Sequence, residues 1–240
     1  MEFLLEKMTW REVEAAVGQA AGIIVPFGAT EEHGPHLPIS TDNIITYELA
    51  CRAAEKTGFI VAPPINYGVC RSTREFPGTI ALRFDTLKQL ALDVISELAA
   101  CGFKKIVLFS FHASNAHMTA IKEAAYDFSL QNRRTKIYFV SSADLATEEI
   151  TKTLETAPYH ACEAETSLML FLKPELVQMD KAEDERPQTP PFLVSPTGKP
   201  WMRTGVLGEP TRATRKKGEI IFNAMTKKLT QILETIKNQT

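Results

Sequence analysis

Short apolar runs alternate with amphipathic segments along this chain, and the alternation predicts strands and helices in turn. Apolar runs of four to eight residues without internal alternation are typical of strands that are buried on both faces. Pro26, which lacks an amide donor, indicates a strand end or an edge strand in the first run. The strands are expected at residues 22–27 (GIIVPF), 59–63, 106–111 (IVLFSF) and 136–141.

Helices are predicted between and after these strands. Leu87, Ala91 and Leu98 recur at helical spacing, Asp85 can cap that helix, and Gly102 ends it. Residues 187–200 hold five prolines and are expected to form an extended surface loop, as is the segment 201–209, for which a lid or an oligomer contact is the alternative. The other expected helices cover residues 8–17, 42–56, 115–131, 143–156, 163–172 and 218–237.

Strands that alternate with helices predict a mostly parallel sheet covered by helices on both faces. We therefore expect an α/β fold with three αβα layers, in which residues 1–240 form a single domain. In such sheets, functional sites form beyond the carboxyl ends of the strands. Polar residues that directly follow a predicted strand are thus the candidates for chemistry.

Composition narrows the class of protein. The 27 basic and 29 acidic residues give a net charge of -2 without any block of one sign, so neither nucleic acid nor a membrane is an expected partner. The four cysteines are widely spread, which favours reduced thiols in a cytoplasmic protein. The first residues lack the features of a signal peptide, and no apolar run of about 18 residues predicts a membrane-spanning helix.

Carboxylate and imidazole side chains gather at three predicted strand ends or helix starts. Glu31 and His33 follow the first strand two residues apart, so an extended backbone would point them the same way, and Asp42 begins the next helix. His112 follows the third strand, and Glu165 lies in the first turn of a later helix. Mixed oxygen and nitrogen ligands suit zinc, manganese or iron, and a carboxylate such as Asp42 can bridge two cations.

Other charged residues near these positions have two interpretations each. His160 can be a proton carrier, and Glu163 can orient a ligand or His160, although it can equally be an exposed helix-start carboxylate. His36 is favoured as a residue behind the ligands. His117 is better explained as a histidine on a helix surface. Taken singly, the candidate ligands can also be solvated loop residues or a charged first turn; together they favour a metal site.

The segment Glu31 to Asp42 matches the pattern E-x-H-G-P-H-L-P-x-x-T-D, and on this motif the chain resembles the creatininase (creatinine amidohydrolase) family. The resemblance continues through Phe76-Pro77-Gly78-Thr79, the strand with His112, and His160 with Glu165-Thr166-Ser167, over roughly residues 8–172. It implies a three-layer αβα domain with a dinuclear site of zinc and manganese or two zinc ions. It also implies a homo-oligomer, since family members are generally hexamers.

Carried over by the resemblance, one metal would be held by Glu31, Asp42 and His112, and the other by His33, Asp42 and Glu165. His160 matches the family's proton-transfer histidine. Two positions depart from the pattern: Ser114 stands where creatininase has a catalytic Glu, and Cys70 and Thr73 stand where Ser and His are common. These three residues, with the backbone of Gly78 and Thr79, are the expected substrate-binding groups.

The resulting hypothesis is a metal-dependent amidohydrolase. Water activated by two divalent cations would hydrolyse a C–N bond of a small cyclic amide or formamide-like substrate, and creatinine itself is disfavoured by Cys70 and Ser114. Two alternatives stay open: the same site could hydrolyse a ring C–C bond of a cyclic ketone, or the chain could be an inactive metal-binding homologue. Arg71, Arg74 and Arg83 could favour an anionic ligand, although surface arginines are the better interpretation.

Overall fold

The computed structural model describes residues 2–239 and has one parallel sheet in the order β2-β1-β3-β4. β1 pairs with β2 through Ile24 and Val61 and with β3 through Val25 and Leu108. The expected α/β fold with a parallel sheet is therefore confirmed. The strands are β1 (Gly22–Phe27), β2 (Phe59–Val61), β3 (Lys105–Ser110) and β4 (Lys136–Ser141).

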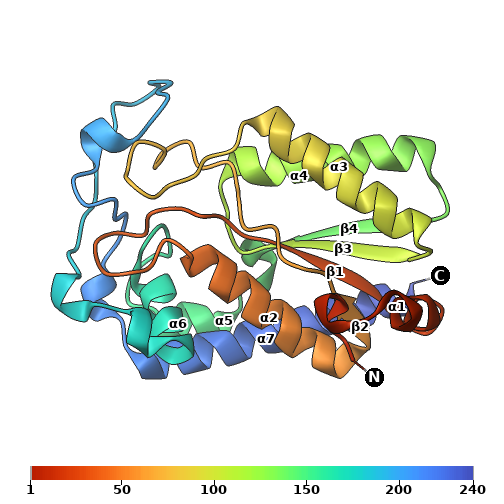
Figure 1. Ribbon diagram of the computed structural model, residues 1–240. Helices are drawn as coiled ribbons and strands as arrows, with labels where there is room; N and C mark the ends of the chain where they lie inside the picture. The colour runs from red at the N-terminus through yellow and green to blue at the C-terminus, as the bar shows by residue number, and fades with distance from the viewer. Residues whose placement is uncertain (1, 240) are drawn as a thin grey trace.

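Helices cover both faces of the sheet and give three layers (Figure 1). One face packs on α2 (Thr41–Thr57), α5 (Glu148–Thr153), α6 (Glu163–Leu172) and α7 (Arg215–Asn238). The other face packs on α3 (Phe84–Ala100) and α4 (Asn115–Gln131), with α1 (Trp10–Val17) at its margin. The 3-10 helices are Leu5–Lys7, Ser142–Leu145, Pro174–Leu176, Met179–Lys181, Lys199–Trp201 and Pro210–Arg212.

Two hydrophobic clusters form the core, one on each face of the sheet. Successive side chains of a strand point to opposite faces, so β1 contributes Ile24 to one cluster and Ile23 and Val25 to the other. All six residues of β1 are buried, which explains why this strand is an unbroken apolar run.

The expectation that Pro26 lies at a strand end is borne out, and two other expected features are wrong in detail. Pro26 lies in a central strand, near its end; its carbonyl accepts from Ile65 N (2.9 Å) on the side where β2 has already ended, so the missing amide donor costs no ladder bond. Asp85 lies within the first turn of α3, after the N-cap residue Arg83. The helix expected over 143–156 is broken, because Thr147 accepts from Ile150 N and starts α5 anew.

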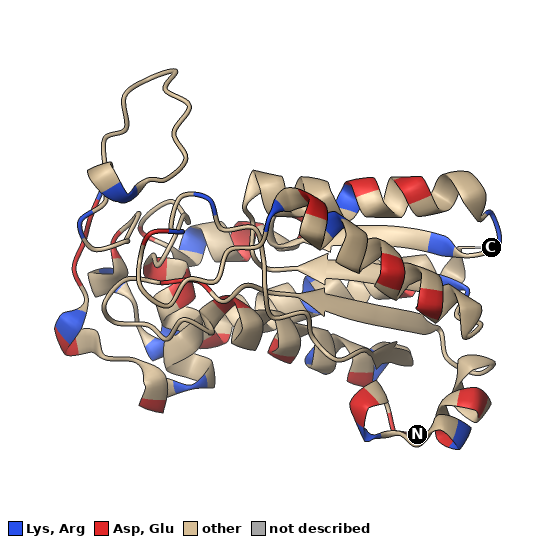
Figure 2. Cartoon of the chain, turned by 45° about the horizontal axis from the view of Figure 1, so that its top comes forward, with Lys and Arg blue, Asp and Glu red and all other residues tan. Residues whose placement is uncertain are grey.

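The carboxyl ends of the strands face the loops and α6, whereas both termini lie at the opposite end of the sheet (Figure 1). Acidic and basic positions are interspersed over the outer helices (Figure 2). Over residues 2–239, no helix is both long and apolar enough to cross a membrane. The loop-bearing end of the sheet is where the candidate ligands meet.

Candidate metal centre

The structure brings the five predicted ligands together. Glu31 and His33 lie in the loop after β1, Asp42 is the second residue of α2, His112 follows β3, and Glu165 lies in the first turn of α6. Each side chain is buried. The strands fix the loops and the helix starts fix Asp42 and Glu165, so the site is anchored on regular structure.

Asp42 lies between the two histidines and presents a different oxygen to each. Its Oδ1 lies 3.5 Å from His33 Nε2 and its Oδ2 lies 2.8 Å from His112 Nδ1. Glu31 Oε2 lies 3.1 Å from His112 Nδ1, and Glu165 Oε2 lies 4.0 Å from His33 Nε2. The result is two half-sites that share one carboxylate, an arrangement suited to a pair of cations.

The imidazole rings are held by the nitrogen that faces away from the carboxylates. His33 Nδ1 lies 3.0 Å from the carbonyl oxygen of Glu31, which leaves Nε2 to face Asp42. His112 Nε2 lies 3.4 Å from the carbonyl oxygen of Val69 and 3.9 Å from Cys70 Sγ. Metal-ligating histidines commonly donate their other N–H in this way. Cys70 therefore touches the side of the His112 ring opposite to Nδ1.

Electrostatics make the centre attractive to cations. Burial disfavours a charged imidazole, yet the neighbouring Asp42 and Glu165 raise the pKa of His33 to about 10. Burial also opposes a charge on His112, but Glu31 and Asp42 hold its pKa well above the usual value. Protons thus take the place that metal ions would fill, and metal binding must displace them.

Unpartnered polar atoms give an independent test of this interpretation. His33 Nε2 and Glu165 Oε2 are buried and have no hydrogen-bond partner. Buried polar atoms without partners are rare in proteins and indicate a missing ion or water. Oxygen and nitrogen donors converge here from both half-sites, so the residues present fit divalent cations such as zinc or manganese.

His160 lies beside the second half-site. Its ring centroid is 4.4 Å from that of His33, and its Nε2 lies 2.8 Å from the carbonyl oxygen of Glu32 and 3.4 Å from Glu32 Oε1. Burial and the nearby His33 lower its pKa, but Glu31 and the bond to Glu32 outweigh them, and the pKa is raised. His160, His33 and Glu165 also form a group close enough to hold one ion, so His160 can be a ligand or a proton carrier.

The backbone around His160 is fixed by a segment near the C-terminus. His160 and Leu207 exchange two backbone hydrogen bonds, of 3.1 and 2.9 Å. Ala161, the next residue, has a left-handed φ of 50°. Non-glycine residues in this region are uncommon and tend to occur at functional sites. The expectation that 201–209 is a plain surface loop is wrong, because this segment holds His160 in place.

Glu32 is the main residue that sequence reasoning missed. It is not among the candidate residues of the sequence analysis, yet its side chain is buried, and its Oε2 accepts from Gly34 N at 2.8 Å. Gly205 packs directly on this carboxylate: a Cβ there would lie 2.0 Å from Glu32 Oε2. The only sequence signal was a second glutamate next to a candidate ligand.

The expected substrate-binding residues occupy two kinds of position. Thr73 Oγ1 donates to Glu31 Oε1, and Thr79 Oγ1 accepts from Glu32 N at 3.0 Å, so both threonines support the ligand loop. A Cβ on Gly78 would lie 3.2 Å from Ile39. Among the five residues, Ser114 lines the central cavity, whereas Cys70 lies behind His112.

Of the two residues expected behind the ligands, His36 contacts the residue next to Glu165, whereas Glu163 binds the segment 155–156 and α7. His36 is buried and its Nε2 lies 2.8 Å from Thr166 Oγ1, next to Glu165; burial and His33 lower its pKa to about 4, so the ring is neutral. Glu163 is buried rather than exposed, and it accepts from Thr156 N (2.9 Å) and from Lys217 Nζ (2.6 Å).

His117 corrects another expectation. It is fully buried rather than exposed on a helix surface, and its Nδ1 accepts from Val69 N at 3.3 Å. Its ring meets that of His112 edge-on at 4.8 Å. Gly68 makes this contact possible, because a Cβ there would lie 2.8 Å from His117 Nδ1. His117 therefore helps to fix the ring of a candidate ligand.

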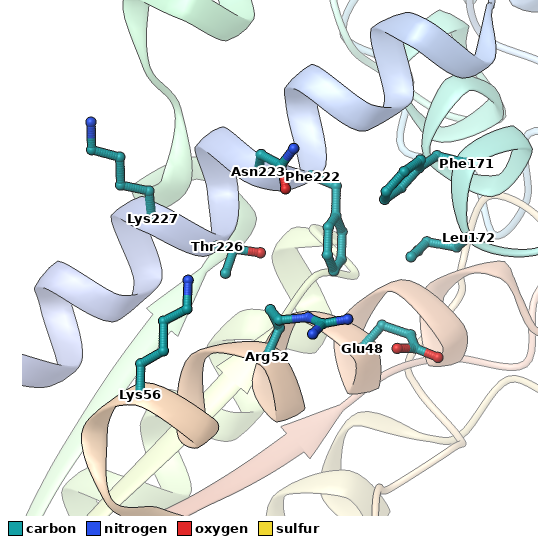
Figure 3. A pocket seen from close by; sticks show the side chains of 9 residues that line it. All are labelled: Glu48, Arg52, Lys56, Phe171, Leu172, Phe222, Asn223, Thr226 and Lys227. Carbon is teal, nitrogen blue, oxygen red and sulfur yellow. The ribbon is translucent and has the colours of Figure 1, made fainter.

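A cavity of about 420 Å³ opens onto the centre and is lined by Glu31, Asp42, His112, His160 and Glu165 together with other residues. A larger groove of about 510 Å³ lies between α2, α6 and α7 (Figure 3). That groove has Glu48 as its one carboxylate, beside Arg52, Lys56 and Lys227, so it offers no comparable ligand set. The candidate metal ligands therefore line the first cavity.

Several known proteins are similar to this chain in sequence. A creatinine amidohydrolase of Pseudomonas putida is 33% identical over an alignment that covers 90% of this chain and 90% of the relative. A mycofactocin precursor peptide peptidase of Mycobacterium ulcerans is 31% identical over 85% of this chain and 80% of the relative. A 3-dehydro-scyllo-inosose hydrolase of Thermotoga maritima is 30% identical over 76% of this chain and 60% of the relative.

Solved structures agree. A manganese form of creatininase covers all of both chains with a TM-score of 0.90 at 28% identity. A zinc form of a creatininase variant with glutamate changed to glutamine gives a TM-score of 0.90 at 27% identity. The family model for creatinine amidohydrolase matches residues 6–233, nearly the whole chain. The family model, the relatives and the motif from Glu31 to Asp42 agree, and this chain belongs to the creatininase family.

Proposed function

We propose that this chain hydrolyses a C–N bond of a small cyclic amide or formamide-like substrate, using two divalent cations, zinc and/or manganese. The observation that carries the proposal is Asp42, whose two oxygens face His33 and His112 from between them. Glu31 and His112 complete one half-site, and His33 and Glu165 the other. The creatinine amidohydrolase relative supports the bond type.

The chemistry divides between the cations and the chain. Bound divalent cations lower the pKa of water and polarise a carbonyl oxygen. In the balanced reaction, the carbonyl carbon gains the hydroxyl of water, the C–N bond breaks, and the nitrogen gains a proton. The carbonyl oxygen of Glu32 accepts from His160 Nε2, so Nδ1 is the ring nitrogen available to give a proton to the leaving nitrogen.

Metal content and rate together test these roles. The full-length chain should bind about two ions, and Asp42→Asn should bind fewer than about one. His160→Gln should keep both ions while kcat for a hydrolysed amide falls by about 10²–10⁴-fold. Loss of metal from the His160 variant would make this residue a ligand instead. Unchanged metal content in Asp42→Asn would overturn the site assignment.

The competing function is hydrolysis of a ring C–C bond in a cyclic ketone, because one relative is a 3-dehydro-scyllo-inosose hydrolase. A panel of cyclic amides, lactams, formamides and cyclic ketones separates the two. Tightly bound metal without turnover of any member would favour an inactive homologue. Ser114 motivates this alternative, because it stands where creatininase has a catalytic Glu. The proposal includes a homo-oligomer, which sedimentation of the purified chain tests.

A further inference from the structure

The cavity at the metal centre has a second, chemically different part. Beyond the candidate ligands and a few serines, its lining is mainly hydrocarbon and comes from the segment 142–159 and from α7. Ile150 and Met225 are buried members of the core cluster on this face of the sheet, and Leu154 packs against that cluster. The apolar wall consists of Phe111, Ala143, Ala146, Ile150, Leu154 and Met225.

Charge is scarce on this lining. Within residues 2–239, no lysine or arginine lines the cavity, and Arg71 instead lines a neighbouring cavity that shares Ser72 and Ser114. Cys162 also lines it, and burial raises the pKa of this thiol to about 12, so it is neutral. Apart from the imidazoles at the metal centre, the lining offers no cation to pair with an anionic substrate, and a charged group against the apolar wall would lose its hydration.

Size points in the same direction. At about 30 Å³ per water-sized group, a cavity of about 420 Å³ holds roughly 14 such groups. A small planar ring would fill only part of this space and leave the apolar wall in contact with water. Ala143 and Ala146 are exposed to it and leave room for a ligand rather than filling the space themselves.

We infer that the natural substrate is an uncharged amide that carries an aliphatic or aromatic group of several carbons, which packs on the apolar wall while the amide lies at the metal centre. The inference rests on the proposed function. Burial of one methylene group raises kcat/KM by about fourfold when the contact persists in the transition state. Three added methylenes should therefore give about 60-fold.

Two homologous series of substrates test the inference on the metal-loaded full chain. One series lengthens an alkyl substituent on the acyl side of a lactam ring, and the other lengthens the nitrogen side of an N-alkyl formamide. The expected result is a steady rise of kcat/KM with chain length in one series, which also identifies the side that the wall receives. Hydrolysis of the shortest members without any gain in either series would overturn the inference, whereas no hydrolysis of any member would overturn the proposed function.

A substitution that fills the apolar part of the cavity gives a second test of the inference. Ala146→Phe should lower the ratio of kcat/KM between the longest and shortest substrates by at least about tenfold, because the ring occupies the volume of the substrate's apolar group. Ala100→Phe, at the exposed end of α3 on the opposite face of the sheet, is the matched control and should leave the ratio unchanged. An unchanged ratio in Ala146→Phe, with metal content intact, would contradict the inference.

Discussion

Gly205 and Gly58 share a left-handed backbone and form a matched pair for testing the role of Glu32. φ is +84° at Gly205 and +78° at Gly58, so an alanine costs about 1–2 kcal/mol of conformational energy at either position. Their surroundings differ. A Cβ at Gly205 would lie 2.0 Å from Glu32 Oε2, whereas Gly58 has no atom within 4 Å of such a Cβ.

Gly58→Ala should therefore lower the free energy of unfolding by about 1–2 kcal/mol, which lowers Tm by roughly 2–8 °C in a chain of this size, with kcat unchanged. Gly205→Ala should lose about 1–3 kcal/mol more, because the methyl group must displace the Glu32 carboxylate. That carboxylate belongs to the residue whose carbonyl holds His160 at 2.8 Å, so kcat should fall by about 10²-fold.

Thermal unfolding and steady-state kinetics on the same metal-loaded preparations measure both effects. The difference between the two variants in unfolding free energy and in kcat matters more than either value, since the cost of a left-handed alanine is the same in both. Equal stability and equal kcat in the two variants would refute the reasoning, because the contact between Gly205 and Glu32 would then have no consequence.

Three further predictions use charges. Lys217 Nζ lies 2.6 Å from Oε1 of both Glu155 and Glu163, whose side chains are 53% and 1% exposed. In chelator-treated protein, Glu163→Gln should therefore lower the free energy of unfolding in urea by about 2–3 kcal/mol, while Glu155→Gln leaves the urea midpoint unchanged. Equal losses in the two variants would contradict the role of burial. In metal-free protein, the raised pKa of His33, about 10, gives stability that is full below pH about 6.5 and is lost as pH rises through about 10. Because the pKa values of His33 and His112 are both raised, zinc binding at pH 8 should release about two protons. Calorimetry in buffers of different ionisation enthalpy measures this release, and no release would contradict the protonated centre.

The ligand set could be predicted because two general regularities coincide in it. Glu31 and His112 directly follow buried strands that lie side by side in the sheet, and parallel strands bring their carboxyl ends to one edge. The local pattern from Glu31 to Asp42 then placed Asp42, the candidate bridging carboxylate, at a helix start. These signals are short-range, so they survive in a single sequence.

The surroundings of His160 could not be predicted for the opposite reason. Glu32, His160 and Leu207 are far apart in the chain, and neither a hydrophobic period nor a motif links them. The break at Thr147 was open to prediction in principle, since a threonine three residues before Ile150 is a capping signal. The apolar period across 143–156 concealed it, because both halves face the same core.

The antiparallel bridge between His160 and Leu207 also bears on how the protein is made. Chains emerge from the ribosome N-terminal end first, so Glu31, His33, Asp42 and His112 are available long before the segment that secures His160. α7, which packs on α2 and α6, the helices of Asp42 and Glu165, follows this segment in the chain. A nascent chain can therefore expose the candidate metal-binding loop early, but the backbone bridge that secures His160 forms only after Leu207 has been synthesised.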